Sequence, residues 1–195
     1  MQALRPRCDE TGALLIFDEI QTGFGRSGSL FAFQKYGVIP DMICLAKALG
    51  GGLPLGALVA GPHLMQAWQS RPVLGHITTF GGHPLSCAAG KAALELLLQE
   101  GWINKVEENA AHFRRRLGWC QKISEIRGEG LLLACELEEE ALCSRFLRKA
   151  IDNGIISDNF LFCGTAFRIS PPLCITSAEI DEACDKIIQT LNELR

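Results

Sequence analysis

The feature that most constrains the fold is a pair of short apolar runs, each of which leads into a charged residue. Ala13 to Phe17 precedes Asp18 and Glu19, and Met42 to Ala46 precedes Lys47. Continuous apolar runs of this length are typical of parallel strands that are buried on both faces. Because open α/β sheets bind ligands at the carboxyl ends of their strands, the pattern predicts an α/β fold with charged side chains at a binding edge.

The rest of the chain divides by composition near residue 100. We expect an α/β sheet portion over residues 1–100 and a smaller α+β domain over residues 101–195, with no internal repeat. Periodicity, glycine and proline positions and a Thr176–Glu179 capping box indicate the elements. The expected strands are 13–17, 42–46, 57–60, 123–127, 131–137 and 167–170, and the expected helices are 62–70, 84–100, 103–117, 139–153 and 176–194.

Composition excludes several kinds of partner. The net charge of −3 leaves no basic footprint for nucleic acid, and no apolar run approaches the length of a membrane span. The nine cysteines are scattered without a CxxC pair, which argues against a disulfide framework and against a zinc site. We therefore predict a cytoplasmic protein with no metal, and with buried thiols in a reducing compartment.

The Asp18–Glu19 pair is open to more than one interpretation. Four apolar residues followed by two carboxylates also describe the Walker B strand of a nucleotide hydrolase, and a strand-end pair can simply cap the next loop. The hydrolase interpretation requires a glycine-rich phosphate loop ending in Lys-Ser or Lys-Thr, and residues 1–195 contain none.

Lys47 is open to two interpretations as well. Most lysines are solvated surface charges. A lysine between an apolar run and the glycines Gly50 to Gly52 is better placed at the floor of a cleft, where an amine can act as a nucleophile.

Four ordered blocks carry a resemblance. They are DEIQTGFGRSG, ICLAKALGGGLPLGA, HITTFGGHPLSCAAG and FRISPPLCIT, which begin at residues 18, 43, 76 and 167. Together they resemble the class III aminotransferases that depend on pyridoxal 5'-phosphate (PLP), with acetylornithine and ornithine aminotransferases as the nearest pattern. The resemblance implies part of a fold type I large domain, like that of aspartate aminotransferase, followed by a small C-terminal domain. The preceding half of such an enzyme would supply further cofactor contacts, so the chain is expected to be a fragment.

The resemblance implies a role for each matched residue. Asp18 resembles the carboxylate that keeps the cofactor's pyridine nitrogen protonated, and Gln21 the side chain near the ring hydroxyl. Lys47 resembles the lysine that holds the cofactor covalently and then moves a proton. Thr79 resembles the hydroxyl that reaches the cofactor phosphate of the partner subunit, which implies a homodimer with shared sites. Arg168 resembles the arginine that binds a substrate carboxylate bidentately, although an ordinary strand-end ion pair is its alternative.

The implied reaction is transamination of small molecules. The donor would be acetylornithine, ornithine or another ω-amino compound, and the acceptor a 2-oxo acid such as 2-oxoglutarate. GABA or diamine aminotransferases, decarboxylases, aminomutases and an inactive fragment remain alternatives that share these blocks. Glu19 is expected to have a structural role that supports the site. His83 stands where the family pattern has asparagine, and we expect it to cap the next helix as a weaker acceptor.

Overall fold

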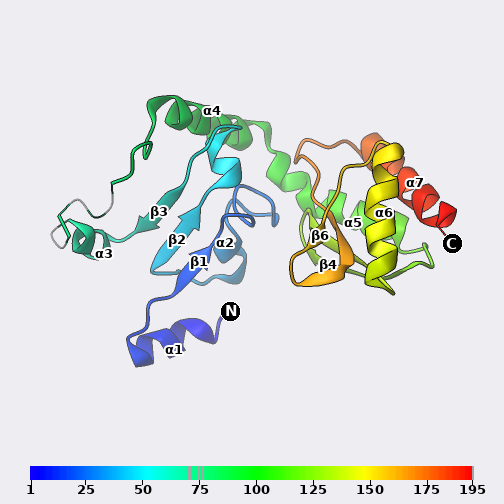
Figure 1. The fold of residues 1–195 in the computed structure, drawn as a ribbon. Coiled ribbons are helices and arrows are strands. Elements are labelled where there is room, and N and C mark those ends of the chain that lie inside the picture. The colour runs from blue at the N-terminus through cyan, green and yellow to red at the C-terminus, as the bar shows by residue number, and fades with distance from the viewer. Residues whose placement is uncertain (70–71, 74, 76, 195) are drawn as a thin grey trace. The chain divides into compact units, whose positions relative to one another are not determined.

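The chain forms two compact units. The computed structural model describes residues 1–69, 72–73, 75 and 77–194. The units comprise Met1–Ile103 and Asn104–Arg195, and each is described by itself (Figure 1).

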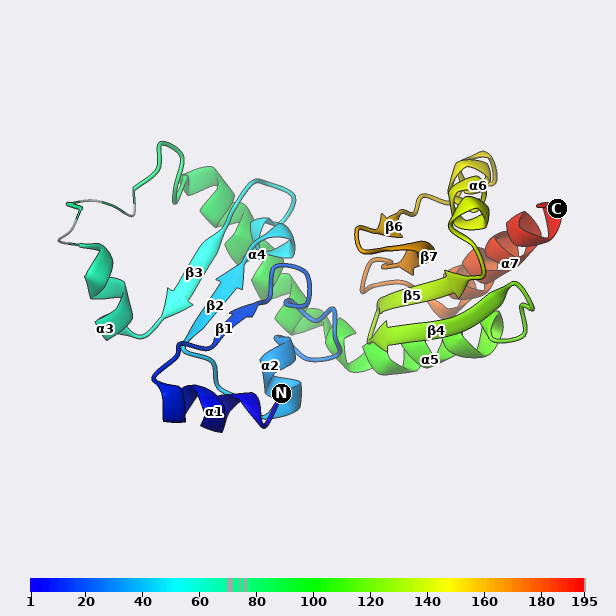
Figure 2. The same cartoon turned by 60° about the horizontal axis from the view of Figure 1, so that its bottom comes forward.

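The first unit is built on a three-stranded sheet. Its strands β1 (Ile16–Asp18), β2 (Met42–Leu45) and β3 (Ala57–Ala60) lie in that order, with β1 parallel and β3 antiparallel to β2 (Figure 2). The helices of this unit are α1 (Leu4–Thr11), α2 (Ala32–Tyr36), α3 (Pro62–Met65) and α4 (Pro84–Glu100), with 3₁₀ turns η1 (Lys47–Gly50) and η2 (Gln66–Trp68). The parallel β1–β2 pair aligns Asp18 with Cys44, so the two predicted charged segments leave the sheet at the same edge.

The first strand is shorter and more exposed than the sequence predicts. Leu15 does not join the strand because its N–H donates to the Asp41 carboxylate at 2.7 Å and its carbonyl accepts from the Asp41 N–H at 2.8 Å. Ile16 is 52% exposed, and β1 is an outer strand of the sheet with one described neighbour. The prediction of a strand buried on both faces is therefore wrong for β1 in this chain.

The long helix of the first unit has the predicted bounds. Pro84 occupies its first turn, and Gly101 ends it with a φ of 66°. His83 lies at the N-cap, but its side chain makes no capping hydrogen bond, so the expected capping role is wrong. The predicted helix 62–70 is interrupted, since α3 passes into η2 at Gln66, and Ser70 lies outside the described residues.

The second unit is an antiparallel sheet covered by helices. Strands β4 (Ile123–Glu129), β5 (Leu132–Leu137), β7 (Cys163–Ile169) and β6 (Asn159–Phe160) follow one another in that order across the sheet. The helices are α5 (Val106–Leu117), α6 (Glu140–Asp152) and α7 (Ser177–Glu193), and the 3₁₀ turn η3 (Trp102–Lys105) precedes α5. Their apolar faces close one core with the sheet, in which Phe146 and Phe167 have ring centroids 4.4 Å apart.

Two features of this unit differ from the prediction. The predicted strand 167–170 is the end of a longer strand that begins at Cys163 and pairs with the short β6, which the sequence does not indicate. The predicted helix 103–117 begins as the η3 turn and becomes α-helical at Val106. The Thr176–Glu179 capping box is confirmed, with Thr176 Oγ1 accepting from the Glu179 N–H at 3.3 Å.

None of the helices that the structure describes is both long and apolar enough to cross a membrane.

Candidate active site

Asp18 is the last residue of β1 and is exposed at the carboxyl end of the sheet. Its Oδ1 accepts the N–H of Ile20 at 3.0 Å, which turns the chain sharply after the strand. A carboxylate in this position is presented at the edge where α/β sheets bind ligands.

Glu19 has the opposite environment. It is 1% exposed, and its Oε1 accepts the N–H of Phe33 at 2.8 Å while Oε2 accepts the hydroxyl of Thr22. Both oxygens of this carboxylate are therefore engaged inside the protein. A magnesium-binding pair of the Walker B kind needs a carboxylate that reaches the ion, and Glu19 does not offer one. No group of three or more His, Cys, Asp or Glu among the described residues is arranged to hold a metal.

Lys47 meets Gln21 at the carboxyl end of β2. Its Nζ donates to Gln21 Oε1 at 3.3 Å across 26 positions of sequence. Lys47 begins η1 and has a φ of 50°, a left-handed conformation that a residue with a Cβ adopts only under local constraint. Such outliers gather at functional sites, and here the conformation brings the amine to the loop that follows Asp18.

The side chain of Lys47 is exposed, so the expectation of an enclosed lysine is wrong for this chain. The neighbours of the η1 turn are the sheet, α4 and the loop that carries Gln21. These segments do not exclude water from the Lys47 Nζ.

The turn that carries Lys47 is seated directly against α4. A Cβ on Gly51 would lie 2.6 Å from the carbonyl oxygen of Ala89, and a Cβ on Gly90 would overlap the carbonyl oxygen of Leu49. Only glycine permits this approach of the two backbones. The backbone position of Lys47 is thus set by α4 as well as by β2.

Thr79 lies in an exposed turn before α4. No hydrogen bond within the described part of the chain joins it to Asp18, Gln21 or Lys47. Thr79 belongs to the same unit as these three residues.

Arg168 belongs to the second unit, on β7 opposite Ala134. Its Nε lies 3.4 Å from Asp158 Oδ1, and its guanidinium carbon lies 4.8 Å from the centre of the Phe160 ring. The sequence left a strand-end ion pair open as the alternative to carboxylate binding by Arg168, and the structure contains this ion pair. The arginine side chain is 23% exposed. The cation–π contact adds a second constraint on the guanidinium.

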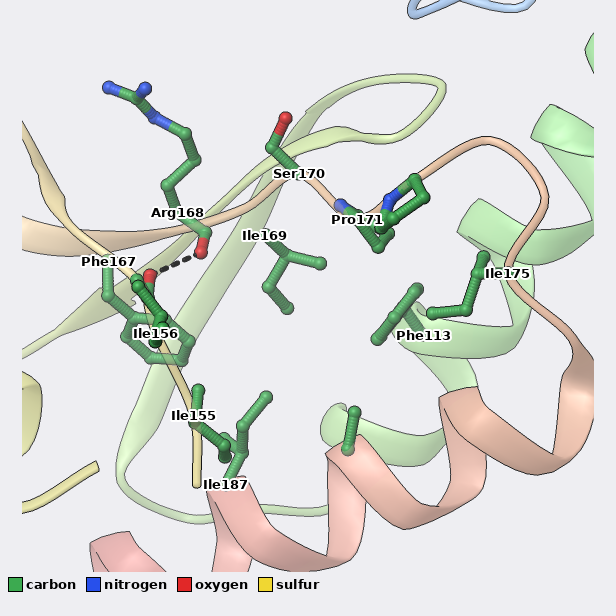
Figure 3. A pocket seen from close by; sticks show the side chains of 13 residues that line it. Phe113, Ile155, Ile156, Phe167, Arg168, Ile169, Ser170, Pro171, Ile175 and Ile187 are labelled. Atoms are coloured by element: carbon green, nitrogen blue, oxygen red, sulfur yellow. Dashed lines mark hydrogen bonds between the residues drawn. The ribbon is translucent and has the colours of Figure 1, made fainter. Parts of the chain in front are cut away.

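An apolar pocket of about 250 Å³ lies behind Arg168 (Figure 3). Phe113, Ile169 and Ile187 are among its lining residues, and the Arg168 side chain extends away from them. The Arg168 carbonyl accepts the Ser157 hydroxyl at 2.6 Å, which fixes the backbone at the pocket rim. The guanidinium is thus directed to the other side of the strand from the pocket.

Comparison with known proteins gives the family of the chain. The family model described as Aminotransferase class-III matches residues 1–191. The acetylornithine aminotransferase of Caldanaerobacter subterraneus subsp. tengcongensis is 40% identical over 202 residues, covering 100% of this chain and 49% of the relative. The putrescine aminotransferase of Pectobacterium atrosepticum is 39% identical over 203 residues, covering 100% of this chain and 42% of the relative.

Solved structures show the same fold. An ornithine aminotransferase from Toxoplasma gondii, described as having partial occupancy of PLP at its active site, matches with a TM-score of 0.87 and 36% identity. The match covers 98% of this chain and 45% of that one. The chain spans about half the length of the curated relatives it matches.

Taken together, these matches remove the nucleotide-hydrolase alternative. The structure is α/β and covers part of the fold of the PLP-dependent aminotransferases. The chain belongs to the class-III aminotransferase family.

Proposed function

We propose that the protein containing this chain is a PLP-dependent aminotransferase. It moves an amino group from acetylornithine, ornithine or another ω-amino donor to a 2-oxo acid such as 2-oxoglutarate. The observation that carries the proposal is the Lys47–Gln21 contact of 3.3 Å at the sheet edge where Asp18 ends the neighbouring strand. Relatives named for acetylornithine and for putrescine support a donor with a terminal amine.

The side chains at this edge fit PLP by their chemistry. The Lys47 amine is a nucleophile for the cofactor's aldehyde, the Asp18 carboxylate is a counter-charge for a protonated pyridine nitrogen, and the Gln21 carboxamide is a partner for the ring hydroxyl. When bound, PLP supplies an electron-withdrawing ring that accepts the electrons released as a bond to the substrate carbon breaks.

Three residues of the protein have separate parts in this chemistry. Lys47 carries a proton to and from the substrate, since an amine at the end of a flexible stem can reach two neighbouring carbons. Asp18 holds negative charge at the strand end, where the Ile20 N–H orients its carboxyl group. Gln21 accepts from the Lys47 ammonium and so defines where that ammonium rests.

Arg168 is proposed to bind a substrate carboxylate. Its present partner Asp158 has a side chain that is 63% exposed, and exposed ion pairs are weak. A substrate carboxylate that binds the guanidinium bidentately can therefore replace Asp158.

The assembly and location follow from the same proposal. We propose that residues 1–100 form the end of the large cofactor domain and residues 101–195 the small domain. Thr79 is proposed to reach the cofactor phosphate of a second subunit in a homodimer, which accords with its exposed position. A cytoplasmic location is proposed as well, because the nine cysteines are scattered along the sequence without a CxxC pair.

The deciding experiment maps the lysine that takes up the cofactor. The protein containing this chain is incubated with PLP, reduced with borohydride and digested, and we expect the phosphopyridoxyl label on Lys47. The Lys47→Ala variant should carry no label, while Lys91→Ala, which removes an exposed lysine of α4, should label normally. A label on another lysine, or none, would overturn the proposal.

Substrate assays then separate the reactions that share this site. Amino transfer from acetylornithine or ornithine to 2-oxoglutarate is the expected result. Release of carbon dioxide without amino transfer would replace transamination by decarboxylation.

A further inference from the structure

Glu19 makes four contacts that the proposed chemistry does not use. Its carboxylate accepts the Phe33 N–H at 2.8 Å and the Thr22 hydroxyl. Its backbone N–H donates to the Cys44 carbonyl at 3.0 Å, and its carbonyl accepts the Gly23 N–H at 3.0 Å. One residue thus links the end of β2, the turn that follows β1 and the start of α2.

These contacts confine the segment that contains Gln21. Residue 19 is tied to β2, and residues 22 and 23 are tied back to residue 19, so Gln21 sits inside a closed turn. Asp18 closes the same turn from the other side through its bond to the Ile20 N–H. A side chain on a turn constrained at both ends keeps its position better than one on an open loop.

The far end of the loop is fixed by aromatic packing. Phe33 stacks on Phe31 at 5.9 Å between ring centroids, and Phe31 meets Phe24 edge-on at 5.5 Å. Phe24 is itself buried. The Phe33 N–H that Glu19 accepts is therefore attached to a packed cluster, which gives the carboxylate a firm anchor.

The hydrogen bonds that the Glu19 carboxylate accepts are stronger than those between neutral groups. A carboxylate that accepts from a backbone N–H and a hydroxyl makes charge-assisted hydrogen bonds, and at 1% exposure water does not compete for them. Removing a buried partner of this kind leaves the Phe33 N–H and the Thr22 hydroxyl without an acceptor.

We propose that Glu19 is a positioning residue that holds Gln21 against the ammonium of Lys47. The inference rests on the proposed function for the purpose of that contact, while the contact itself can be measured without cofactor. The Glu19 side chain makes no described hydrogen bond to Lys47 or Gln21, and it acts through Thr22 and Phe33. The bond from the Gly23 N–H goes to the Glu19 backbone carbonyl and does not depend on the side chain.

The test uses nuclear magnetic resonance on the protein containing this chain, without PLP. The readouts are the Overhauser contact between the Gln21 carboxamide protons and the Lys47 side chain, and the exchange rate of the Phe33 amide. In Glu19→Ala we expect the contact to disappear and Phe33 exchange to accelerate by roughly tenfold, the effect of one charge-assisted hydrogen bond. In Glu19→Gln both should be largely restored, because the amide oxygen can accept from Phe33 and the amide nitrogen can donate to Thr22.

Two further variants provide a milder test, in case Glu19→Ala does not fold, and a control. Thr22→Val removes one of the two partners of the carboxylate and should weaken the Gln21–Lys47 contact without abolishing it. Asp41→Asn is the matched control, because Asp41 is another carboxylate of this unit that accepts from a side chain and a backbone N–H, those of Arg5 and Leu15. This control should leave the Gln21–Lys47 contact unchanged.

A second measurement ties the result to the cofactor. In the protein containing this chain, Glu19→Ala should still be labelled at Lys47 by borohydride reduction with PLP. The visible circular dichroism of the bound cofactor should weaken, because its surroundings no longer hold one geometry.

The outcomes distinguish the inference from the proposed function. An unchanged Overhauser contact in folded Glu19→Ala, or a folded Glu19→Gln that behaves like alanine, would overturn the positioning role. If Glu19→Ala does not fold, an unchanged contact in Thr22→Val overturns it instead. Failure of the unaltered protein to take up PLP would overturn the proposed function and leave the magnetic resonance result standing.

Discussion

Asp18 and Glu19 are consecutive residues with opposite surroundings, and that difference assigns their roles. Successive side chains of an extended segment point to opposite sides, so one carboxylate reaches solvent at the sheet edge and the other enters the protein. Asp18 is exposed, whereas Glu19 is 1% exposed and bonded on both oxygens. The first is available to a ligand, and the second serves the protein.

The residue-scale prediction concerns the charge of Asp18. Asp18→Asn keeps an oxygen for the Ile20 N–H, so the turn should persist, but the amide cannot balance a positive pyridine nitrogen. We expect turnover by the protein containing this chain to fall roughly 100-fold, as when one electrostatic partner of a reacting group is removed. Single-turnover kinetics measures this loss. Asp9→Asn, which changes an exposed carboxylate of α1, should have no effect, and an unaltered rate in Asp18→Asn would contradict the assignment.

At the scale of elements, the packing of α4 on η1 determines the position of the Lys47 backbone. The backbones meet at glycines, so the helix acts as a rigid support for a turn of four residues. The strained φ of Lys47 persists because β2 holds one end of the turn and α4 holds the other.

Gly90→Ala tests this support. Alanine favours helix over glycine by about 1 kcal/mol, yet its Cβ would overlap the Leu49 carbonyl oxygen. We expect a net loss of about 1–3 kcal/mol in the free energy of unfolding, measured by denaturant titration, together with slower PLP labelling of Lys47. The control is Ala92→Gly on the exposed side of α4, which should cost about 1 kcal/mol through helix propensity while Lys47 labels normally. A stabilised Gly90→Ala protein would show that the contact is not tight.

The capping box of α7 predicts a pH dependence. Hydrogen bonds from the Thr176 backbone and hydroxyl hold the pKa of Glu179 below its usual value. The ionised form is therefore favoured by folding. Its contribution is complete above the ordinary glutamate pKa of about 4.3 and is lost as the pH falls through the lower folded value.

Glu179→Gln measures that contribution, because glutamine keeps a capping oxygen and does not titrate. The unaltered chain should be the more stable at neutral pH, and the difference should close as the solution is acidified through this range. Denaturant titration of both proteins at a series of acid pH values gives the comparison. A difference that stays constant into strong acid would show that ionisation of Glu179 adds nothing.

At the scale of the whole molecule, the two units differ in how completely they bury apolar surface. The continuous core cluster lies within residues 106–191, all in the second unit. In the first unit the sheet leaves Ile16 and Val59 about half exposed. This contrast accords with a chain that spans about half the length of its relatives, because a sheet needs cover on both faces.

Phe146→Ala tests the independence of the second core. Phe146 is fully buried against Phe167, so its removal should cost about 3–5 kcal/mol in unfolding of that unit. Hydrogen exchange by mass spectrometry should show faster exchange over residues 104–194. The exchange rates over β1 and β2 should not change. Phe162→Ala is the matched control, because Phe162 is 100% exposed, and it should change neither unit. Equal acceleration in both units would mean that they unfold together.

Local pattern decided much of this structure in advance. The bounds of α4 and β3 and the capping box of α7 follow from side chains close in sequence, which is why they could be predicted. The four motif blocks likewise determined the family, because a motif is a local arrangement of residues.

Tertiary structure alone decided the rest, since those features depend on partners distant in sequence. Asp41 shortens β1 by taking the backbone of Leu15, 26 positions away, and β6 exists only because β7 pairs with it. Gln21 meets Lys47 across the same separation of 26 residues. The sequence by itself determined which residue types stand at the strand ends. Only the packing of strands, loop and helix decided which of those side chains is buried, which is exposed and which two touch.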